Sequence, residues 1–255
     1  MSVSDACVRF FEMNKGMSEA FRSRFNLEDE SPFWDKFDDL VADYARKLDD
    51  KAVVIDLGGG SSCRFAERIP RARGVQLIAV DISADELAMN HDVDECRVAD
   101  VSRRLPFDDG QVDLLVSRAL LEHVDGVPRA VAEMGRVLRQ GGTALHFVPC
   151  RYSLFGLAAR LLPFEPLKRL LHFVRPETRG VVEFEVHYDS GVPATMRKLF
   201  LASGFEEVEI SVCWSQSGYF LPIFPLYIPV AIYQWLARAL RVESLGAYMI
   251  VRATR

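Results

Sequence analysis

The stretch VVIDLGGGSS, residues 53–62, decides the fold of this chain. Its apolar first half predicts a buried strand, which runs directly into Gly58, Gly59 and Gly60. Glycine allows a backbone to turn sharply and to approach a ligand closely, because it lacks a Cβ and reaches positive φ. Open α/β sheets bind ligands at the carboxyl ends of their parallel strands. The sequence therefore predicts a ligand-binding turn after this strand.

Further short apolar runs continue the pattern on both sides of this turn. They alternate with polar stretches of helical character, and near-continuous Val/Ile/Leu runs separated by helices indicate a parallel sheet that is buried on both faces. The expected strands are 52–57, 75–81, 96–100, 112–117, 142–148, 205–214 and 246–254. The expected helices are 62–69, 84–90, 127–139 and 192–202, the last of them ending at Gly204.

The N-terminal segment, residues 1–50, has a different character from the rest. It holds 12 Asp and Glu against 7 Lys and Arg, and its apolar residues recur at helical spacing. Ser31 and Pro32 suit the start of a second helix. We therefore expect a helical cap over 1–50 and one α/β domain over 51–255, with a lid or acceptor insertion at 150–191 and an apolar addition at 215–245.

Composition excludes several classes of protein. A chain of 255 residues with a net charge of −5 is not a general binder of nucleic acid. Its five cysteines show no C-x-x-C spacing, so they predict reduced thiols rather than a disulfide scaffold or a metal site. The first residues lack the uninterrupted apolar core of a signal peptide, which favours a cytoplasmic location.

The spacing of acids and glycines narrows the class of ligand that this turn can bind. The dinucleotide fingerprint G-x-G-x-x-G would need glycine at position 63, which is Cys63, and no P-loop motif is present. Asp81 ends the second strand, about 20 residues beyond the glycines, where a carboxylate accepts both hydroxyls of a ribose. Asp100 ends the third strand in the same way.

Three further motifs carry a resemblance: VADVSRRLPFDDGQVDLLVS at 98–117, LLEHV at 120–124 and GRVLRQGGTALHFVP at 135–149. Together with the glycine turn, this set resembles the class I S-adenosylmethionine-dependent methyltransferases of the type 11 methyltransferase domain family. The resemblance implies a Rossmann-like, seven-stranded, mostly parallel sheet with helices on both faces. It also implies S-adenosyl-L-methionine as the cofactor and methyl transfer as the activity.

The resemblance also implies a role for individual residues. The turn residues Asp56, Gly58 and Gly60 match the family's contact with the methionine part of the cofactor. The remaining matches are Asp81 for the ribose, Ile82, Asp100 and Val101 for the adenine, and Ser117 at the end of the fourth strand. Ser62 stands where the family usually has a glycine, which predicts altered packing of the following helix.

Two histidines are the candidate catalytic groups, because hydroxyl acceptors profit from a general base. His123 lies in LLEHV. His187 lies in VVEFEVHYDS (181–190), where alternation puts Glu183, Glu185 and His187 on one strand face. A solvated strand face is the alternative interpretation of that pattern, and we expect no metal there.

Two apolar segments outside the core motifs, the apolar additions, indicate the chemical class of the methyl acceptor. Residues 151–175 carry five Lys and Arg and one acid among leucines and phenylalanines, and residues 210–237 are uncharged. They favour a hydroxyl acceptor on a small molecule, a saccharide or a lipid-linked intermediate. A quinone or natural-product C- or O-methyltransferase and a non-catalytic scaffold remain alternatives. For the additions themselves, a lid, a homodimer face and peripheral membrane contact stay open, and prolines argue against a membrane span.

Overall fold

The computed structural model describes residues 3–27, 31–161, 190–216 and 220–255, with residues 163, 165, 166, 168, 169 and 172. The chain divides into two compact units. The helical unit comprises Met1–Phe33, Cys150–Glu185 and Val212–Tyr248, and the sheet unit comprises Trp34–Pro149, Val186–Ser211 and Met249–Arg255. The segment 1–50 is therefore shared between the two units.

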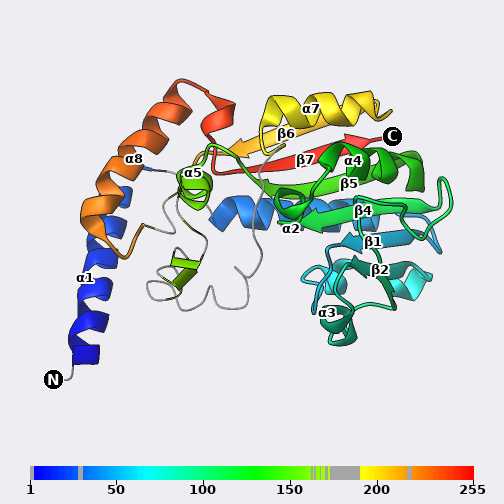
Figure 1. Ribbon diagram of the computed structural model, residues 1–255, viewed down its shortest axis with the longest axis horizontal. Coiled ribbons are helices and arrows are strands. Elements are labelled where there is room, and N and C mark those ends of the chain that lie inside the picture. The colour runs from blue at the N-terminus through cyan, green and yellow to red at the C-terminus, as the bar shows by residue number, and fades with distance from the viewer. Residues whose placement is uncertain are drawn as a thin grey trace. The chain divides into compact units, whose positions relative to one another are not determined.

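A seven-stranded sheet forms the centre of the sheet unit, with the strand order β3-β2-β1-β4-β5-β7-β6. Figure 1 shows these strands lying side by side. The Rossmann-like α/β fold expected from the sequence is confirmed. The strands are β1 (Val53–Leu57), β2 (Gln76–Asp81), β3 (Glu95–Val98), β4 (Val112–Arg118), β5 (Leu138–Pro149), β6 (Glu207–Cys213) and β7 (Tyr248–Thr254).

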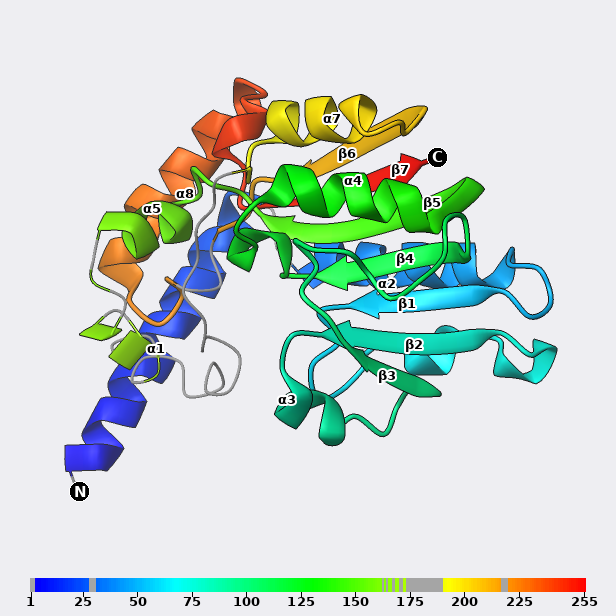
Figure 2. The same cartoon turned by 45° about the vertical axis from the view of Figure 1, so that its right-hand side comes forward.

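The direction of the strands follows from their pairing. β1 pairs in parallel with β2 and β4, and β2–β3 and β4–β5 are also parallel. β7 runs antiparallel to β5, because Gly141 N–H donates to the Arg255 carbonyl and Cys150 N–H donates to that of Ala247. The carboxyl ends of β1, β2 and β4 thus meet at one edge of the sheet, where the glycine turn lies (Figure 2).

Helices cover both faces of the sheet, as two adjacent residues of β5 demonstrate. The Phe147 ring stacks on Trp34 of α2 (Ser31–Arg46) with 4.0 Å between centroids, whereas the His146 ring lies 5.3 Å from Phe200 of α7 (Pro193–Ala202). Successive side chains of a strand point to opposite faces, so α2 and α7 cover opposite faces. The sheet unit also contains α3 (Ala84–Ala88) and α4 (Val127–Val137), and α5 (Leu154–Leu161) belongs to the helical unit.

The prediction of a helix at 62–69 is wrong. Two short 3-10 turns, Ala66–Arg68 and Arg71–Arg73, form between β1 and β2 instead. Pro70 disfavours helical backbone at Ile69, and the Cys63 amide donates to the Asp92 carboxylate at 2.9 Å. The glycine turn is therefore held by side chains of the β2–β3 connection rather than by a long helix.

In the helical unit, α1 (Val3–Arg24) packs against α8 (Phe224–Ala239). Figure 1 shows the two helices side by side. The α8 sequence contains two prolines, Pro225 in its first turn and Pro229 inside. A first-turn proline costs no intrahelical bond, so only Pro229 removes one. Among the described residues, no helix is both long and apolar enough to cross a membrane.

Two buried polar residues of α1 fix the start of α8. The Asn14 side-chain oxygen accepts the Phe224 amide at 3.1 Å, and the Ser18 hydroxyl donates to the Leu221 carbonyl at 2.9 Å. Ile223 at the helix N-cap makes no side-chain cap bond. Asn14 therefore supplies from another helix the cap that the local sequence lacks.

We expect Asn14→Ala to lower the free energy of unfolding by about 1–2 kcal/mol, because it leaves the partly buried Phe224 amide without its acceptor. Chemical denaturation followed by circular dichroism measures this change. Lys15→Ala on the exposed side of α1 is the matched control and should change stability by less than about 0.5 kcal/mol. Equal stability of the two variants would contradict the cap.

Candidate functional site

The glycine turn after β1 leaves no space for side chains at two positions. A Cβ on Gly58 would lie 2.9 Å from the Leu120 side chain, and one on Gly59 would lie 2.9 Å from the Ala79 Cβ. Gly58 and Gly60 also have positive φ, +77° and +44°. The turn is therefore packed tightly against both β2 and the segment that follows β4. At Gly60, by contrast, a Cβ would meet no atom closer than 3.8 Å.

Asp81 ties the ends of β1 and β2 together. One of its carboxylate oxygens accepts the Gly60 amide at 3.1 Å, and the other accepts the Ser83 amide at 2.9 Å. Each carboxylate oxygen has a second lone pair, so both can still accept a hydroxyl of a ligand. The side chain is partly exposed, which leaves it accessible from solvent.

Asn90, which the sequence reasoning missed, supports the same turn. Its buried side-chain amide donates to the carbonyls of Gly59 and Gly60 at 3.2 and 3.0 Å. Its side-chain oxygen in turn accepts the Asp92 amide at 3.1 Å. The local sequence MNHD gives no sign of this role, because the partners are about thirty residues away in the chain.

Asp56 is a buried acid beneath the turn. Burial raises its pKa to about 7, while a hydrogen bond from the Cys63 thiol and the charge of Arg118 act in the opposite direction. Arg118, at the end of β4, lies over the Trp34 ring at 4.6 Å and pairs with Asp38 at 3.3 Å. The resemblance-based prediction for Asp56 thus falls on a buried carboxyl group that lies close to Gly59 and bonds Cys63.

The residues expected beside an adenine lie at the ends of β2 and β3. Ile82 is 68% exposed, which leaves an apolar surface open to a ligand. Asp100 accepts the amide and the hydroxyl of Ser102, and these bonds lower its pKa. Val101 is half-buried beside it.

Ser117 and His146 form a buried pair between β4 and β5. The Ser117 hydroxyl lies 2.7 Å from His146 Nδ1, and both side chains are inaccessible to solvent. Burial lowers the pKa of His146 to about 3, so the ring is neutral. The Ser117 side chain therefore faces the interior, which leaves only its backbone for a ligand.

The sequence LLEHV places an acid and a histidine after β4. Glu122 is buried, with one carboxylate oxygen unpaired, and burial raises its pKa to about 8. His123 keeps 28% of its side chain exposed, and its Nε2 lies 3.9 Å from the other Glu122 oxygen. Sequence reasoning selected His123 and passed over Glu122, although a lone acid among apolar residues was the available signal.

His187, with Glu183 and Glu185, lies outside the described residues.

The buried Glu122 predicts a pH dependence of stability. Its folded pKa is raised above the unfolded value, so its stabilising contribution is complete below the unfolded pKa and is lost as pH rises toward 8. The wild-type protein should therefore lose stability between pH 6 and pH 8. In Glu122→Gln this loss should shrink by roughly 2 kcal/mol, measured by denaturant unfolding at both pH values. Glu133→Gln, at a partly buried acid paired with Arg136, is the control. An unchanged pH dependence in Glu122→Gln would refute a neutral buried Glu122.

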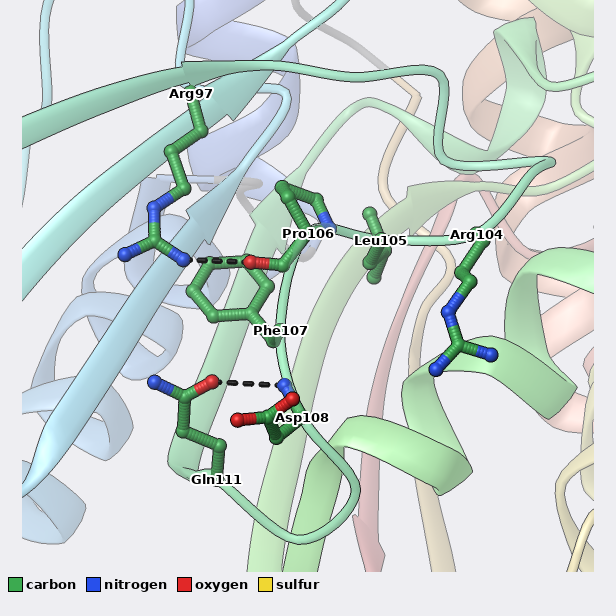
Figure 3. A pocket seen from close by; sticks show the side chains of 7 residues that line it. All are labelled: Arg97, Arg104, Leu105, Pro106, Phe107, Asp108 and Gln111. Carbon is green, nitrogen blue, oxygen red and sulfur yellow. Dashed lines mark hydrogen bonds between the residues drawn. The ribbon is translucent and has the colours of Figure 1, made fainter.

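An open cavity of about 480 Å³ lies elsewhere in the sheet unit. Figure 3 shows Arg97 donating to the Pro106 carbonyl and Gln111 accepting the Asp108 amide at its wall. None of the residues predicted to bind a cofactor lines it. Its lining runs from Arg97 in β3 to Gln111, which immediately precedes β4.

The glycine turn lies within the part of the chain that matches known proteins. Residues 55–146 match the family model described as "Methyltransferase domain". The demethylmenaquinone methyltransferase of Mycobacterium marinum is 34% identical over 100 residues, 39% of this chain and 41% of that protein. The malonyl-(acyl-carrier protein) O-methyltransferase of Pectobacterium atrosepticum is 34% identical over 92 residues, 35% of each chain. The chain thus matches about two fifths or less of these curated relatives.

A solved structure shares the fold over a longer stretch. Geranyl diphosphate C-methyltransferase from Streptomyces coelicolor, crystallised with S-adenosyl-L-homocysteine, superposes with a TM-score of 0.54 at 15% identity. The superposition covers 86% of this chain and 78% of that one. At this identity the likeness concerns the fold alone. The resemblance predicted from the sequence motifs is confirmed by these comparisons.

Proposed function

We propose that the chain is an S-adenosylmethionine-dependent methyltransferase that acts on a small-molecule biosynthetic intermediate, because residues 55–146 match a methyltransferase domain. The observation that carries this proposal is Asp81. Its two oxygens hold the turns after β1 and β2 together and keep a lone pair each for a ribose diol. When bound, S-adenosyl-L-methionine supplies a methyl group already activated on a sulfonium.

The residues of the turn fit this cofactor. Gly60 has open space where a side chain would stand, so the backbone can lie against the methionine part. The exposed Ile82 offers an apolar contact for a purine, and Val101 and Asp100 lie at the end of the next strand. Asp56 acts from beneath the turn, and Ser117 contributes its backbone. These assignments rest on the motif resemblance together with the described contacts.

For the acceptor, we propose a hydroxyl on a small molecule, a saccharide or a lipid-linked intermediate. The apolar and basic additions of the helical unit suit an acceptor with an apolar chain. The M. marinum relative is named a demethylmenaquinone methyltransferase, which favours a quinone or natural-product C- or O-methyltransferase as the second candidate. A non-catalytic scaffold is the third candidate.

We propose that one of two histidines is the general base that deprotonates a hydroxyl acceptor. His123 follows β4 by a few residues, and Leu120 of the same segment packs on Gly58. His123 therefore stands at the ligand-binding edge, with the Glu122 carboxyl 3.9 Å away. His187 remains the second proposal, on its strand pattern alone.

A direct assay tests the function. The purified protein is incubated with methyl-labelled S-adenosylmethionine and a panel of hydroxylated lipids, saccharides and quinols, and the label is followed into product. Transfer to a quinol ring carbon would support the second candidate over O-methylation. Cofactor binding without turnover of any acceptor would favour the scaffold. Absence of cofactor binding would overturn all three candidates.

A further inference from the structure

Helix α8 presents a wholly apolar face to solvent. Its buried face is formed by residues at helical spacing, among them Tyr227, Val230 and Gln234. The opposite face exposes Ile232 at 52% and Trp235 at 57%. The other exposed residues of the helix up to position 237 are Pro225, Leu226, Pro229 and Leu236. A surface helix normally carries polar residues on this side.

The first two charges that follow this face along the chain are both basic, and the exposed Glu243 comes after them. No charged residue occurs between positions 210 and 237, and the next two charges along the chain are Arg238 and Arg241, both exposed. An apolar helix face that ends in basic side chains, with a tryptophan at its side, has the chemistry of a helix lying in a lipid interface. Arginine at that position pairs with anionic lipid headgroups.

The size of the face argues against a second copy of the chain as its partner. A helix of 16 residues is about 24 Å long and about 10 Å wide, so its outer half offers on the order of 250 Å². A stable dimer buries about 800 Å² on each partner. Binding to a bilayer surface grows with the buried apolar area and with attraction to anionic lipids, so a face of this size suits weak, reversible attachment.

We propose that the outer face of α8, with Arg238 and Arg241 at its end, docks the protein on anionic lipid surfaces. The helix lies in the interface and does not cross it. This inference is independent of the proposed methyl transfer, because it concerns binding to lipid and not turnover.

Vesicle flotation at low salt tests the proposal, with phosphatidylcholine–phosphatidylglycerol vesicles compared with pure phosphatidylcholine. The wild-type protein should float with the anionic vesicles and be released by salt. Ile232→Glu should weaken binding at least about tenfold, because it places a charge in the apolar face. Leu201→Glu, at a helical leucine of matched exposure (48%) in α7, should bind as the wild type does. Arg238→Gln and Arg241→Gln should each weaken binding about fivefold.

Trp235 provides a second readout. Its fluorescence should shift to shorter wavelength on anionic vesicles, and Trp235→Phe should abolish that shift while Trp34 and Trp214 remain. Absence of flotation at low salt would overturn the proposal, as would equal binding to neutral vesicles. A concentration-dependent dimer that Ile232→Glu dissociates, with no lipid binding, would assign the face to a second copy instead.

Discussion

Asp81→Ala should weaken the binding of S-adenosylhomocysteine by about 30- to 1000-fold. The substitution removes a carboxylate proposed to accept two ribose hydroxyls, and charge-assisted hydrogen bonds of this kind contribute about 2–4 kcal/mol together. Isothermal titration calorimetry measures the change directly. S-adenosylhomocysteine is the suitable probe, because it lacks the reactive methyl group and needs no acceptor.

The same carboxylate also holds the Gly60 and Ser83 amides, so part of the effect is on the shape of the turn. Asp81→Asn separates the two contributions. Its amide retains one oxygen acceptor but replaces the other with a donor, and it removes the charge. We expect an intermediate loss in Asp81→Asn, because one ribose hydroxyl still finds an acceptor.

Asp85→Ala is the matched control, since Asp85 is an exposed acid four residues further along the chain, in α3. It should bind the probe as the wild type does. Wild-type affinity in a folded Asp81→Ala would refute the ribose assignment. Equal losses in Asp81→Ala and Asp85→Ala would show a general effect of charge rather than a contact.

The central sheet could be predicted from the sequence because its signals are local. Each parallel strand is a short apolar run between polar segments, and three successive glycines indicate the turn after β1. The acid at the end of β2 follows from strand length and spacing. Such features need no knowledge of distant residues, and the structure reproduces them.

Contacts between distant residues account for what sequence reasoning missed. Asn90 supports the glycine turn only because the β2–β3 connection folds back on it, and no local pattern shows this. Asn14 likewise caps α8 from more than two hundred residues away. The helix expected at 62–69 fails for a local reason instead, because Pro70 disfavours helical backbone at Ile69.

His123→Ala should lower kcat by about 10²–10⁴-fold with the acceptor identified by the labelling assay, because general-base catalysis contributes about that much. The expected loss falls on kcat and not on cofactor affinity. His123 stands at the carboxyl edge of the sheet with a partly exposed ring, and none of the contacts described for the glycine turn involves it. Calorimetry with S-adenosylhomocysteine should therefore give the wild-type affinity for this variant.

His187→Ala is the competing variant, and the two results together decide the assignment. A loss of the same size in His187→Ala, with wild-type turnover in His123→Ala, would move the base to His187. His146→Ala is not an informative control, because the buried His146 ring bonds Ser117 and its removal leaves a cavity. His91→Ala, at an exposed histidine, serves instead and should leave kcat unchanged. Because a structural role for His123 would reduce stability as well as kcat, unfolding of His123→Ala is measured alongside, and imidazole rescue of kcat in a folded variant would identify a proton-transfer role.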